Sequence, residues 1–520
     1  AAWGGLLTYH STMERESERR QTILAIVVAS AALTVGLAAS FGVCTQDDAF
    51  ISFRYAENFW NGHGLVYNIG QPVEGFTNLS WTLLIALGLE AGWEPVMWSM
   101  ALGLASLVLG IVACAGLAGA VDGWKWAVVA PVFLAGDAQI ALEAVEGLES
   151  LLFMAVVSFG LWRLLVEADS RKSHVGSSVL FALALLTRPE GLGVFGLGHI
   201  ALLWLAWASG AFRLQWSKTW MTTWPVWVTM LGLTVWRLHT YGEWLPNTFY
   251  AKSGGLHLVR GCIYVGEHMM RHPVLWGLAV LGGLKGSTPV RVHTVVALGY
   301  VAYVITIGGD FKPTGRFLMP ILPCLAVLAA VGLEVSVRDR ANRWAKWGLL
   351  GALGIAHLLG VWRVERECRN WSADRHANLE ARKTVGDFLS AQLPPDTLLA
   401  IHSAGAIPYF AGFPTIDMWG LTDHHIARTQ PQGSEAGHEK SDPQYVFGDN
   451  WFGRPPDLYL PEERVFTLKP WSLEPPPNFP DGFVDAYKSV SIAVEGRWLN
   501  IWTRKGFLSE AARRGGGQGG

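Results

Sequence analysis

The chain has 520 residues, of which 51% are apolar and only 16% are charged, and its net charge is −2. Soluble globular proteins are nearer a quarter charged, so this composition excludes a disordered chain and an ordinary cytosolic protein, and the balanced charge gives no support for a nucleic-acid partner. The 26 tryptophans are typical of a protein whose indole rings lie at membrane interfaces. The five cysteines include no CxxC pair and support neither a zinc site nor a disulfide framework. The composition therefore predicts a polytopic membrane protein.

Charge and proline divide the chain near residue 363. Charged residues make up 36 of the last 157 residues but only 46 of the first 363, and 14 of the 25 prolines lie in that last part. We expect a membrane body over 22–363 and a water-soluble α/β domain over 364–520, which is long enough to bury its own core. Residues 1–21 read as an N-terminal tail, in which Met13 opens the native sequence and 1–12 are non-native. The terminal GGGQGG reads as low-complexity tail.

The first hydrophobic segment, Thr22–Val43, has 22 residues without a charge and can cross a hydrocarbon core of about 30 Å. A cleaved signal peptide is the alternative, but the later spans and the lack of a small-x-small site favour an uncleaved span. Further spans are predicted at Leu79–Leu89, Val96–Ala118, Trp126–Gly136, Leu151–Val166, Val175–Leu186, Leu192–Ser209, Trp224–Leu238, Pro273–Leu284, Val295–Ile307, Leu318–Val335 and Trp347–Val361.

Several of these spans are shorter than the roughly 17 residues of an independent crossing, which favours broken helices around a cavity. Basic clusters mark the expected cytoplasmic ends: Arg15, Arg19 and Arg20; Arg171 and Lys172; Arg338, Arg340, Arg343 and Lys346. Twelve spans would return the C-terminus to the cytoplasm. Because we expect the α/β domain outside, the predicted number is odd, 11 or 13.

The loop over 44–78 lies between the first two spans and faces the exterior if the N-terminus is inside. Phe50, Phe53 and Trp60 recur at helical spacing, which predicts a helix in the membrane interface that ends at Gly62-His63-Gly64. Asp47 and Asp48 stand at its N-terminus. Two roles fit acidic residues at this position: they cap the helix, or one of them is a general base that acts on a hydroxyl acceptor. The residues alone leave both interpretations open.

Other ionisable residues border hydrophobic segments, beside glycine or proline, in ALEAVEGLES, LTRPEG, LPNTFYAKSGG and GGDFKPTGRF. Charges at membrane depth are costly and face a cavity or pair with each other. Structural ion pairs or snorkelling explain any single cluster. Four clusters together favour a shared polar cavity, in which arginine and lysine suit a phosphate ligand.

Common nucleotide and hydrolase motifs do not account for this chain. Gly191, Gly193 and Gly196 satisfy G-x-G-x-x-G, but they lie in an apolar segment without a βαβ unit, so we reject a dinucleotide site. The sequence has no P-loop, HExxH or GxSxG. A soluble nucleotide donor therefore has no recognisable binding motif.

The blocks QDDAFISFRYAENFWNGHGLVYN, GLES, TRPEG, LPNTFYAK and GGDFKPTGRFLMP resemble those of the GT-C membrane glycosyltransferases. They most resemble the lineage of mycobacterial terminal arabinofuranosyltransferases and uncharacterised bacterial relatives, and GLTDHHIAR with GHEK extends the likeness into the tail domain. The resemblance implies a GT-C-like helical body, a polyprenyl-phosphate sugar donor and a catalytic Asp in the first extracytoplasmic loop. That role falls on Asp48 or Asp47, which are adjacent.

The same resemblance implies an inverting transfer of a sugar, such as a pentofuranose, to an envelope glycan, lipid or protein acceptor in the bacterial cytoplasmic membrane. No cofactor is expected, although a divalent metal is compatible. The residues expected to bind the donor phosphate are Arg188, Lys252, Lys312 and Arg316. Those expected to line the cavity are Arg54, His63, Glu74, Glu149, Glu190, Asn247 and Asp310. A transporter or flippase of lipid-linked sugars, or a non-enzymatic envelope assembly protein, would also fit intramembrane charges.

The C-terminal domain alternates short helical and extended patterns. We predict a helix over Leu379–Leu389, strands over Thr397–Ile401 and Thr415–Asp417, a helical turn over Ala406–Phe410, and late strands over Val490–Val494 and Trp498–Trp502. A metal site would draw on His402, Asp423, His424, His425, His438 and Glu439. Their spacing matches no metal-ligand motif, so acceptor recognition is the preferred role of the domain.

Overall fold

The computed structural model describes residues 2–122, 124–170, 172–253, 255–310, 312, 315–338, 342–431, 439–461, 465–476 and 478–515. The structure does not describe Arg171, Arg340, His438 or residues 516–520 of the terminal GGGQGG, nor the side chains of Arg15 and Arg343. The chain forms two compact units. Unit 1 contains residues 1–43, 99–232 and 256–372, and unit 2 contains 44–98, 233–255 and 373–520.

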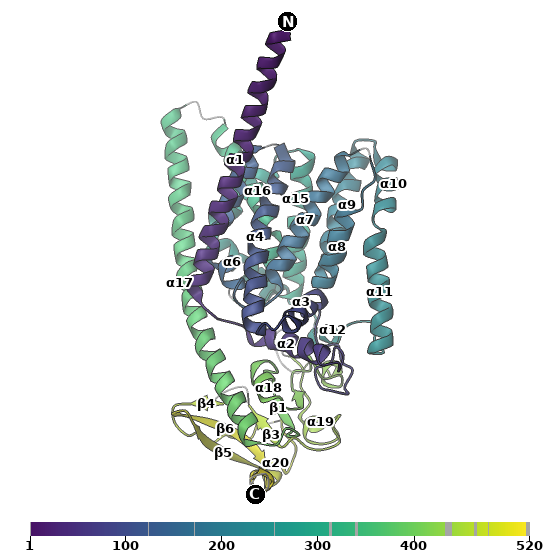
Figure 1. Ribbon diagram of the computed structural model, residues 1–520, viewed down its shortest axis with the longest axis vertical. Helices are drawn as coiled ribbons and strands as arrows, with labels where there is room; N and C mark the ends of the chain where they lie inside the picture. The colour runs from purple at the N-terminus through teal and green to yellow at the C-terminus, as the bar shows by residue number, and fades with distance from the viewer. Residues whose placement is uncertain are drawn as a thin grey trace. The chain divides into compact units, whose positions relative to one another are not determined.

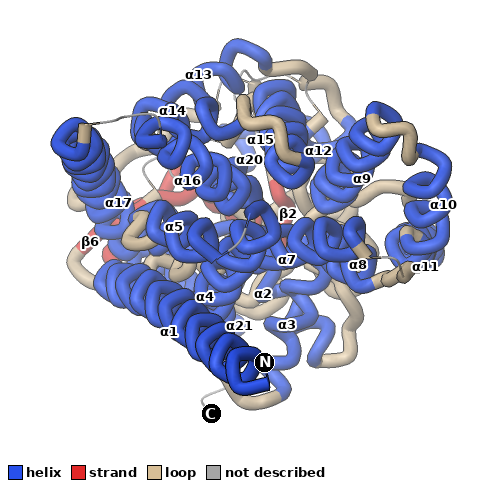
Figure 2. Tube along the Cα trace, turned by 90° about the horizontal axis from the view of Figure 1, so that it is seen from above, coloured by secondary structure: helices blue, strands red, loops and turns tan. Residues whose placement is uncertain are grey.

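Unit 1 is helical (Figure 1). Its complete helices are α1 (Ala2–Phe41), α5 (Trp124–Leu134), α6 (Ala138–Glu143), α7 (Ser150–Asp169), α8 (Gly176–Thr187), α9 (Glu190–Ala208), α10 (Phe212–Thr222), α13 (Leu258–Arg271), α14 (Pro273–Gly283), α15 (Thr288–Ile307), the 3-10 helix η1 (Arg316–Ile321) and α16 (Leu322–Arg338). Parts of α4 (Pro95–Asp122), α11 (Trp224–Thr240) and α17 (Arg343–Gln392) also belong to it. Within this unit, α8 lies between α7 and α9 (Figure 2).

Each of the predicted spans falls on a helix, because the long apolar runs favour backbone hydrogen bonds that are satisfied within one segment. In the described part of the chain, seven helices are long and apolar enough to cross a membrane, and four more apolar helices are shorter. The structure contains no bilayer, so the number of crossings stays a prediction. The multi-pass helical character of the chain is confirmed.

Small residues allow close helix packing in unit 1. A Cβ atom added to Gly282 of α14 would lie 1.9 Å from the carbonyl oxygen of Leu328, and one added to Gly332 of α16 would lie 1.9 Å from that of Leu278. The two backbones therefore touch at both glycines, and any larger residue would push α14 and α16 apart. This is the packing expected for helices in lipid, where small residues at the contact permit dispersion interactions between backbones.

Unit 2 contains a mixed sheet in the order β2-β1-β3-β6-β4, with β5 also paired to β6 (Figure 1). The strands are β1 (Leu399–Ile401), β2 (Thr415–Asp417), β3 (Leu458–Leu460), β4 (Phe466–Thr467), β5 (Tyr487–Val494) and β6 (Arg497–Arg504). β1 is parallel to β2 and β3, whereas β6 is antiparallel to its neighbours. The predicted α/β character is confirmed.

The helices of unit 2 are α2 (Asp47–Trp60), α3 (Leu79–Glu90), α12 (Asn247–Lys252), α18 (Ala406–Ala411), η2 (Ile426–Arg428), α19 (Pro443–Phe447), α20 (Phe483–Ala486) and α21 (Phe507–Gly515). The predicted helical turn corresponds to α18. The helix predicted over Leu379–Leu389 is part of the 50-residue α17, which also contains residue 363, where composition placed the domain boundary.

The first loop belongs to the same core as the sheet. Tyr55 and Phe76 from the loop share a buried cluster with Leu399 of β1 and Ile501 of β6. Helix α2 forms where its spacing predicts and ends before Gly62. The interfacial placement stays a prediction, because the structure contains no bilayer and Trp60 is exposed, but Phe50 and Phe53 on the apolar face are buried within the protein.

The reason is contact with α18. Phe50 and Phe53 have no exposed surface, and the Phe50 ring centroid lies 5.4 Å from that of Tyr409 and 5.2 Å from that of Phe410. Amphipathic spacing shows that a helix has an apolar face, but protein and lipid can both cover such a face. In this chain, aromatic residues of α18 cover the part of the face that contains Phe50 and Phe53.

Candidate functional site

The acidic pair opens α2, and its two members have different surroundings. Asp47 Oδ1 lies 2.5 Å from Nη1 of Arg382 and accepts a hydrogen bond of 2.8 Å from the backbone N–H of Ala406, the first residue of α18. Burial raises the pKa of Asp47, and Arg382 and the Ala406 N–H lower it. Asp48 is partly exposed. The fold thus uses Asp47 to join α2, α17 and α18.

Arg54 and Glu74, both expected in the cavity, bind other parts of unit 2. Arg54 Nε donates to the Tyr67 carbonyl at 2.8 Å, and Nη2 donates to that of Phe413 at 2.7 Å. Glu74 is 3% exposed and forms an ion pair of 2.8 Å with Arg237, a partner that no sequence motif predicts. These contacts hold the first loop against the rest of the unit. His63 is exposed in the turn after α2.

Asn247, from the LPNTFYAK block, is also tied to the tail domain. Its Nδ2 donates to the carbonyls of Gly420 and Asp423 at 2.9 and 3.1 Å, and its Oδ1 accepts from Nη1 of Arg428 at 3.0 Å. Arg428 lies in the GLTDHHIAR block, so two motifs distant in sequence meet here. Lys252, in the last turn of α12, is exposed.

In unit 1, two of the predicted phosphate-binding residues share a pocket. Its lining consists of Ser150, Phe153, Arg188, Tyr300, Arg316, Phe317 and Pro320. Both guanidinium groups lie against the Phe317 ring, with Cζ 5.5 Å (Arg188) and 5.2 Å (Arg316) from its centroid. The Ser150 hydroxyl is buried and has no hydrogen-bond partner among the described residues. A polar ligand in this pocket could bond with that hydroxyl and with both cations.

Carboxylates fix the two arginines. Arg188 pairs with Glu149 at 2.6 Å and with Glu190 at 3.1 Å, and Arg316 pairs with Asp310 at 2.7 Å. Glu149, Glu190 and Asp310, which were expected to line the cavity, therefore form ion pairs with the two arginines. These pairs hold the two guanidinium groups in fixed orientations beside the pocket.

Lys312 occupies a different environment. Its Nζ lies 3.0 Å from Oε2 of Glu146, and neither side chain has exposed surface. Glu146 Oε1 also accepts a hydrogen bond of 3.0 Å from Nε1 of Trp371. Lys312 does not line the pocket of Arg188 and Arg316, and Lys252 belongs to unit 2. The structure thus brings together two of the four predicted phosphate-binding residues.

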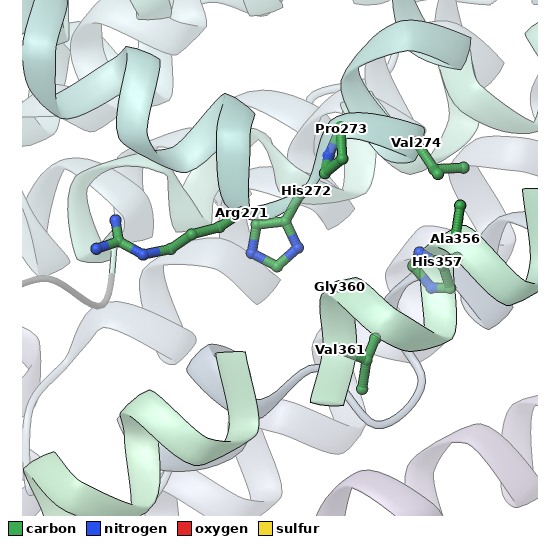
Figure 3. Close-up of a pocket in the computed structure, with 8 residues that line it drawn as sticks. All are labelled: Arg271, His272, Pro273, Val274, Ala356, His357, Gly360 and Val361. Atoms are coloured by element: carbon green, nitrogen blue, oxygen red, sulfur yellow. The ribbon is translucent and has the colours of Figure 1, made fainter. Parts of the chain in front are cut away.

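A second pocket of unit 1 is lined by Arg271, His272, Pro273, Val274, Ala356, His357, Gly360 and Val361. Figure 3 shows the Arg271 side chain directed away from His357. Arg271 pairs instead with Glu267 at 3.3 Å and with Glu367 at 2.9 Å. His272 Nε2 is 2.9 Å from Oε1 of Gln139. With these groups engaged by the protein, the pocket does not present the paired cations of the first one.

The described residues contain no group of three His, Cys, Asp or Glu side chains that could hold a metal ion. His424 Nε2 lies 2.8 Å from Glu243, and His425 Nε2 lies 2.8 Å from Asp442. His424 and His425 therefore have separate acidic partners, and the His402 ring lies instead against Trp419 and Tyr459. His438 lies outside the described residues.

Comparison with known proteins gives three findings. Residues 369–502 match the model of a domain of unknown function (DUF8728). The terminal β-(1→2)-arabinofuranosyltransferase from Corynebacterium glutamicum is 27% identical in an alignment of 399 residues that covers 64% of this chain. The enzyme of the same name from Mycobacterium tuberculosis is 27% identical in an alignment of 380 residues that covers 63% of this chain. The chain spans 54% and 58% of the length of these two relatives.

Among solved structures, ArnT from Cupriavidus metallidurans bound to undecaprenyl phosphate matches with a TM-score of 0.57 and 13% identity, over 93% of this chain and 98% of that one. The archaeal oligosaccharyltransferase AglB from Archaeoglobus fulgidus, in complex with an inhibitory peptide and a dolichol-phosphate, matches with a TM-score of 0.56 and 10% identity, over 84% and 69%. At these identities the likeness concerns the fold. The chain therefore has a GT-C-like fold, and its sequence is similar to those of terminal arabinofuranosyltransferases.

Proposed function

We propose that this protein is a membrane glycosyltransferase that transfers an arabinofuranose residue from a polyprenyl-phosphate donor to a cell-envelope glycan. The sugar follows the names of the two bacterial relatives, and the lipid phosphate follows the molecules named in the ArnT and AglB structures. The observation that carries the proposal is the acidic pair of α2. Both acids are partly exposed at the start of α2, and contacts of Asp47 with Arg382 and the Ala406 N–H hold this end of the helix in place.

The proposed reaction is a single displacement. Asp48 accepts the proton of the acceptor hydroxyl while the hydroxyl oxygen forms a bond to the anomeric carbon of the sugar. The bond between that carbon and the phosphate oxygen breaks, and the electron pair leaves with the polyprenyl phosphate. This route inverts the anomeric configuration.

Arg188 and Arg316 are proposed to bind the donor phosphate. A guanidinium can give two parallel hydrogen bonds to a phosphate, and matching the charge of the leaving group lowers the barrier to its departure. The paired carboxylates keep both side chains oriented in the absence of a ligand. Ser150 could add a neutral hydrogen bond from its buried hydroxyl.

We place the protein in the bacterial cytoplasmic membrane, with residues 364–520 on the outer side. The support is indirect: basic residues such as Arg19 and Arg20 precede the first apolar segment, as is typical of a cytoplasmic end. The acceptor, a glycan of the envelope, would meet the partly exposed first-loop acid on the opposite side.

The decisive experiment uses purified protein in nanodiscs, a synthetic polyprenyl-phosphoryl arabinofuranose labelled in the sugar, and an arabinan oligosaccharide acceptor. We expect label in the oligosaccharide, and NMR of the new linkage should show an anomeric configuration opposite to that of the donor. Retained configuration would contradict the single displacement. Absence of transfer by the wild type, with donor binding intact, would contradict the proposed activity.

A further inference from the structure

Arg382 contacts the acidic pair from outside the first loop. It lies on α17, is partly buried, and places Nη1 2.5 Å from Oδ1 of Asp47. The same oxygen accepts the N–H of Ala406 at 2.8 Å. One carboxylate oxygen therefore connects the first turn of α2 to α17 and to the first residue of α18.

Gly405 allows this connection to be short. A Cβ atom at this position would lie 2.0 Å from the backbone oxygen of Asp47 and 2.5 Å from its Oδ2. Since neither distance is possible for real atoms, any other residue would displace the start of α18 from α2. The absence of a side chain at Gly405 is thus a steric condition for the contact between Asp47 and Ala406.

One turn further on, Phe50 of α2 packs on Tyr409 and Phe410 of α18, and in the turn after that Arg54 Nη1 donates to the Pro408 carbonyl at 3.1 Å. The aromatic packing holds the helix in place but constrains rotation of its first turn weakly, because dispersion contacts have little directionality. A charge-assisted hydrogen bond is directional and short. The Arg382 contact is of this kind and acts on the first turn of α2 itself, whereas the Arg54 hydrogen bond acts two turns further along the helix.

We propose that Arg382 is a positioning residue, which acts through Asp47 to fix the first turn of α2 and so the direction of the Asp48 carboxylate. This inference rests on the proposed function, because it assumes that Asp48 is the base. It assigns to Arg382 no contact with either substrate. A misplacement of about 1 Å in a reacting group can lower a rate by about 10²-fold, so such a residue matters even at a distance from the chemistry.

The test is a double-mutant cycle on turnover with Arg382→Gln and Asp47→Asn. If Arg382 acts through Asp47, each single variant lowers kcat by about 10²-fold with a nearly unchanged KM for the donor, and the double variant is no worse than either single one. Arg382→Lys, which keeps the charge, should recover part of the activity. Additive losses, or a change confined to KM, would overturn the proposal.

Lys383 provides the matched control. It neighbours Arg382 on α17, and its Nζ lies 5.7 Å from the Phe410 ring of α18, so Lys383→Gln disturbs the same helix pair without touching Asp47. We expect near wild-type kcat in this variant and additivity with Asp47→Asn. A loss equal to that of Arg382→Gln would show that general packing of α17 on α18, not orientation, explains the effect.

A second readout separates failure of this inference from failure of the proposed function. Hydrogen exchange of the peptide covering 44–55 does not depend on catalysis. Arg382→Gln should accelerate exchange in the first turn of α2, whereas Lys383→Gln should not. Unchanged exchange in Arg382→Gln would contradict the positioning role, even if the wild type transferred no sugar. If the wild type is inactive but exchange in Arg382→Gln is accelerated, only the proposed activity is contradicted.

Discussion

Lys312 and Glu146 form an ion pair in which Nζ and Oε2 are 3.0 Å apart and both side chains are fully buried. A buried pair of this kind offsets the cost of removing two charges from water only while both partners are present. Trp371 adds a hydrogen bond to the second carboxylate oxygen. Lys312 therefore stabilises unit 1, although its position in the GGDFKPTGRF block predicted a phosphate ligand.

The first prediction follows from that pair. Lys312→Met should lower the free energy of unfolding by about 3–5 kcal/mol, because it leaves Glu146 buried without a cation. In Lys312→Met/Glu146→Leu most of this loss should be recovered. Thermal unfolding in detergent measures both effects. Reduced donor affinity in a fully stable Lys312→Met protein would instead restore the phosphate-binding role.

The second prediction concerns the base. Asp48→Asn preserves size but removes basicity, so turnover should fall by about 10²–10⁴-fold while donor binding and stability stay near wild type. If Asp48 only caps α2, the same variant should have almost no effect, because asparagine caps a helix as well as aspartate does. Near-normal turnover of both Asp48→Asn and Asp47→Asn would move the search for a base to Glu149, Glu190 or Asp310.

The third prediction concerns the donor phosphate. Arg188→Ala and Arg316→Ala should each weaken donor binding by about 30- to 4,000-fold, corresponding to about 2–5 kcal/mol for loss of a hydrogen-bonded charge partner. Arg338→Ala is the control, because this arginine is exposed at the end of α16. Isothermal titration with a polyprenyl phosphate measures the affinities. Equal affinity in all three variants would indicate that the ion pairs are purely structural.

The fourth prediction is a pH dependence at Glu74. Burial raises its pKa, and Arg237 lowers it. In Arg237→Met the folded-state pKa should rise further above the unfolded value of about 4.3. The unfolded chain then loses its proton first as pH increases, so the stability of this variant should fall from pH 5 to pH 8, by up to about 4 kcal/mol, which is the limit for one group over three pH units.

The control for this prediction is Glu74→Gln/Arg237→Met, which has no titrating group at either position. Its stability relative to the wild type should change much less over the same pH range. Chemical unfolding at several pH values gives the comparison. A loss in Arg237→Met that is independent of pH would mean that lost packing of the arginine side chain, not the unpaired carboxylate, determines stability.

The fifth prediction concerns topology. Protease added to intact spheroplasts should remove the C-terminal domain, because we place residues 364–520 outside the membrane. A tag on the first residues should survive, since the N-terminus is expected inside. Cleavage of the C-terminal domain only after lysis would reverse the orientation and would favour an even number of spans.

The sequence by itself determined the local structure of this protein. Uninterrupted apolar runs specify helices because backbone groups in lipid must be satisfied within one segment, and helical spacing with a terminal Gly62 specifies α2. In the C-terminal domain, the alternation of short helical and extended patterns likewise predicted β1 and β2. All of these depend on neighbours a few residues apart. The block resemblance to GT-C enzymes added the expected fold.

Tertiary structure alone decided the partners of the charged side chains. Lys312 and Glu146 are separated by 166 positions, and Arg237 and Glu74 by 163. No local pattern encodes such pairs, because an ion pair requires only that two side chains meet after folding. The roles of Asp47 and Asp48 cannot be told apart from the sequence, because the two residues are adjacent. Contact with Arg382 and Ala406 distinguishes them, because only the folded chain brings those two groups to one carboxylate.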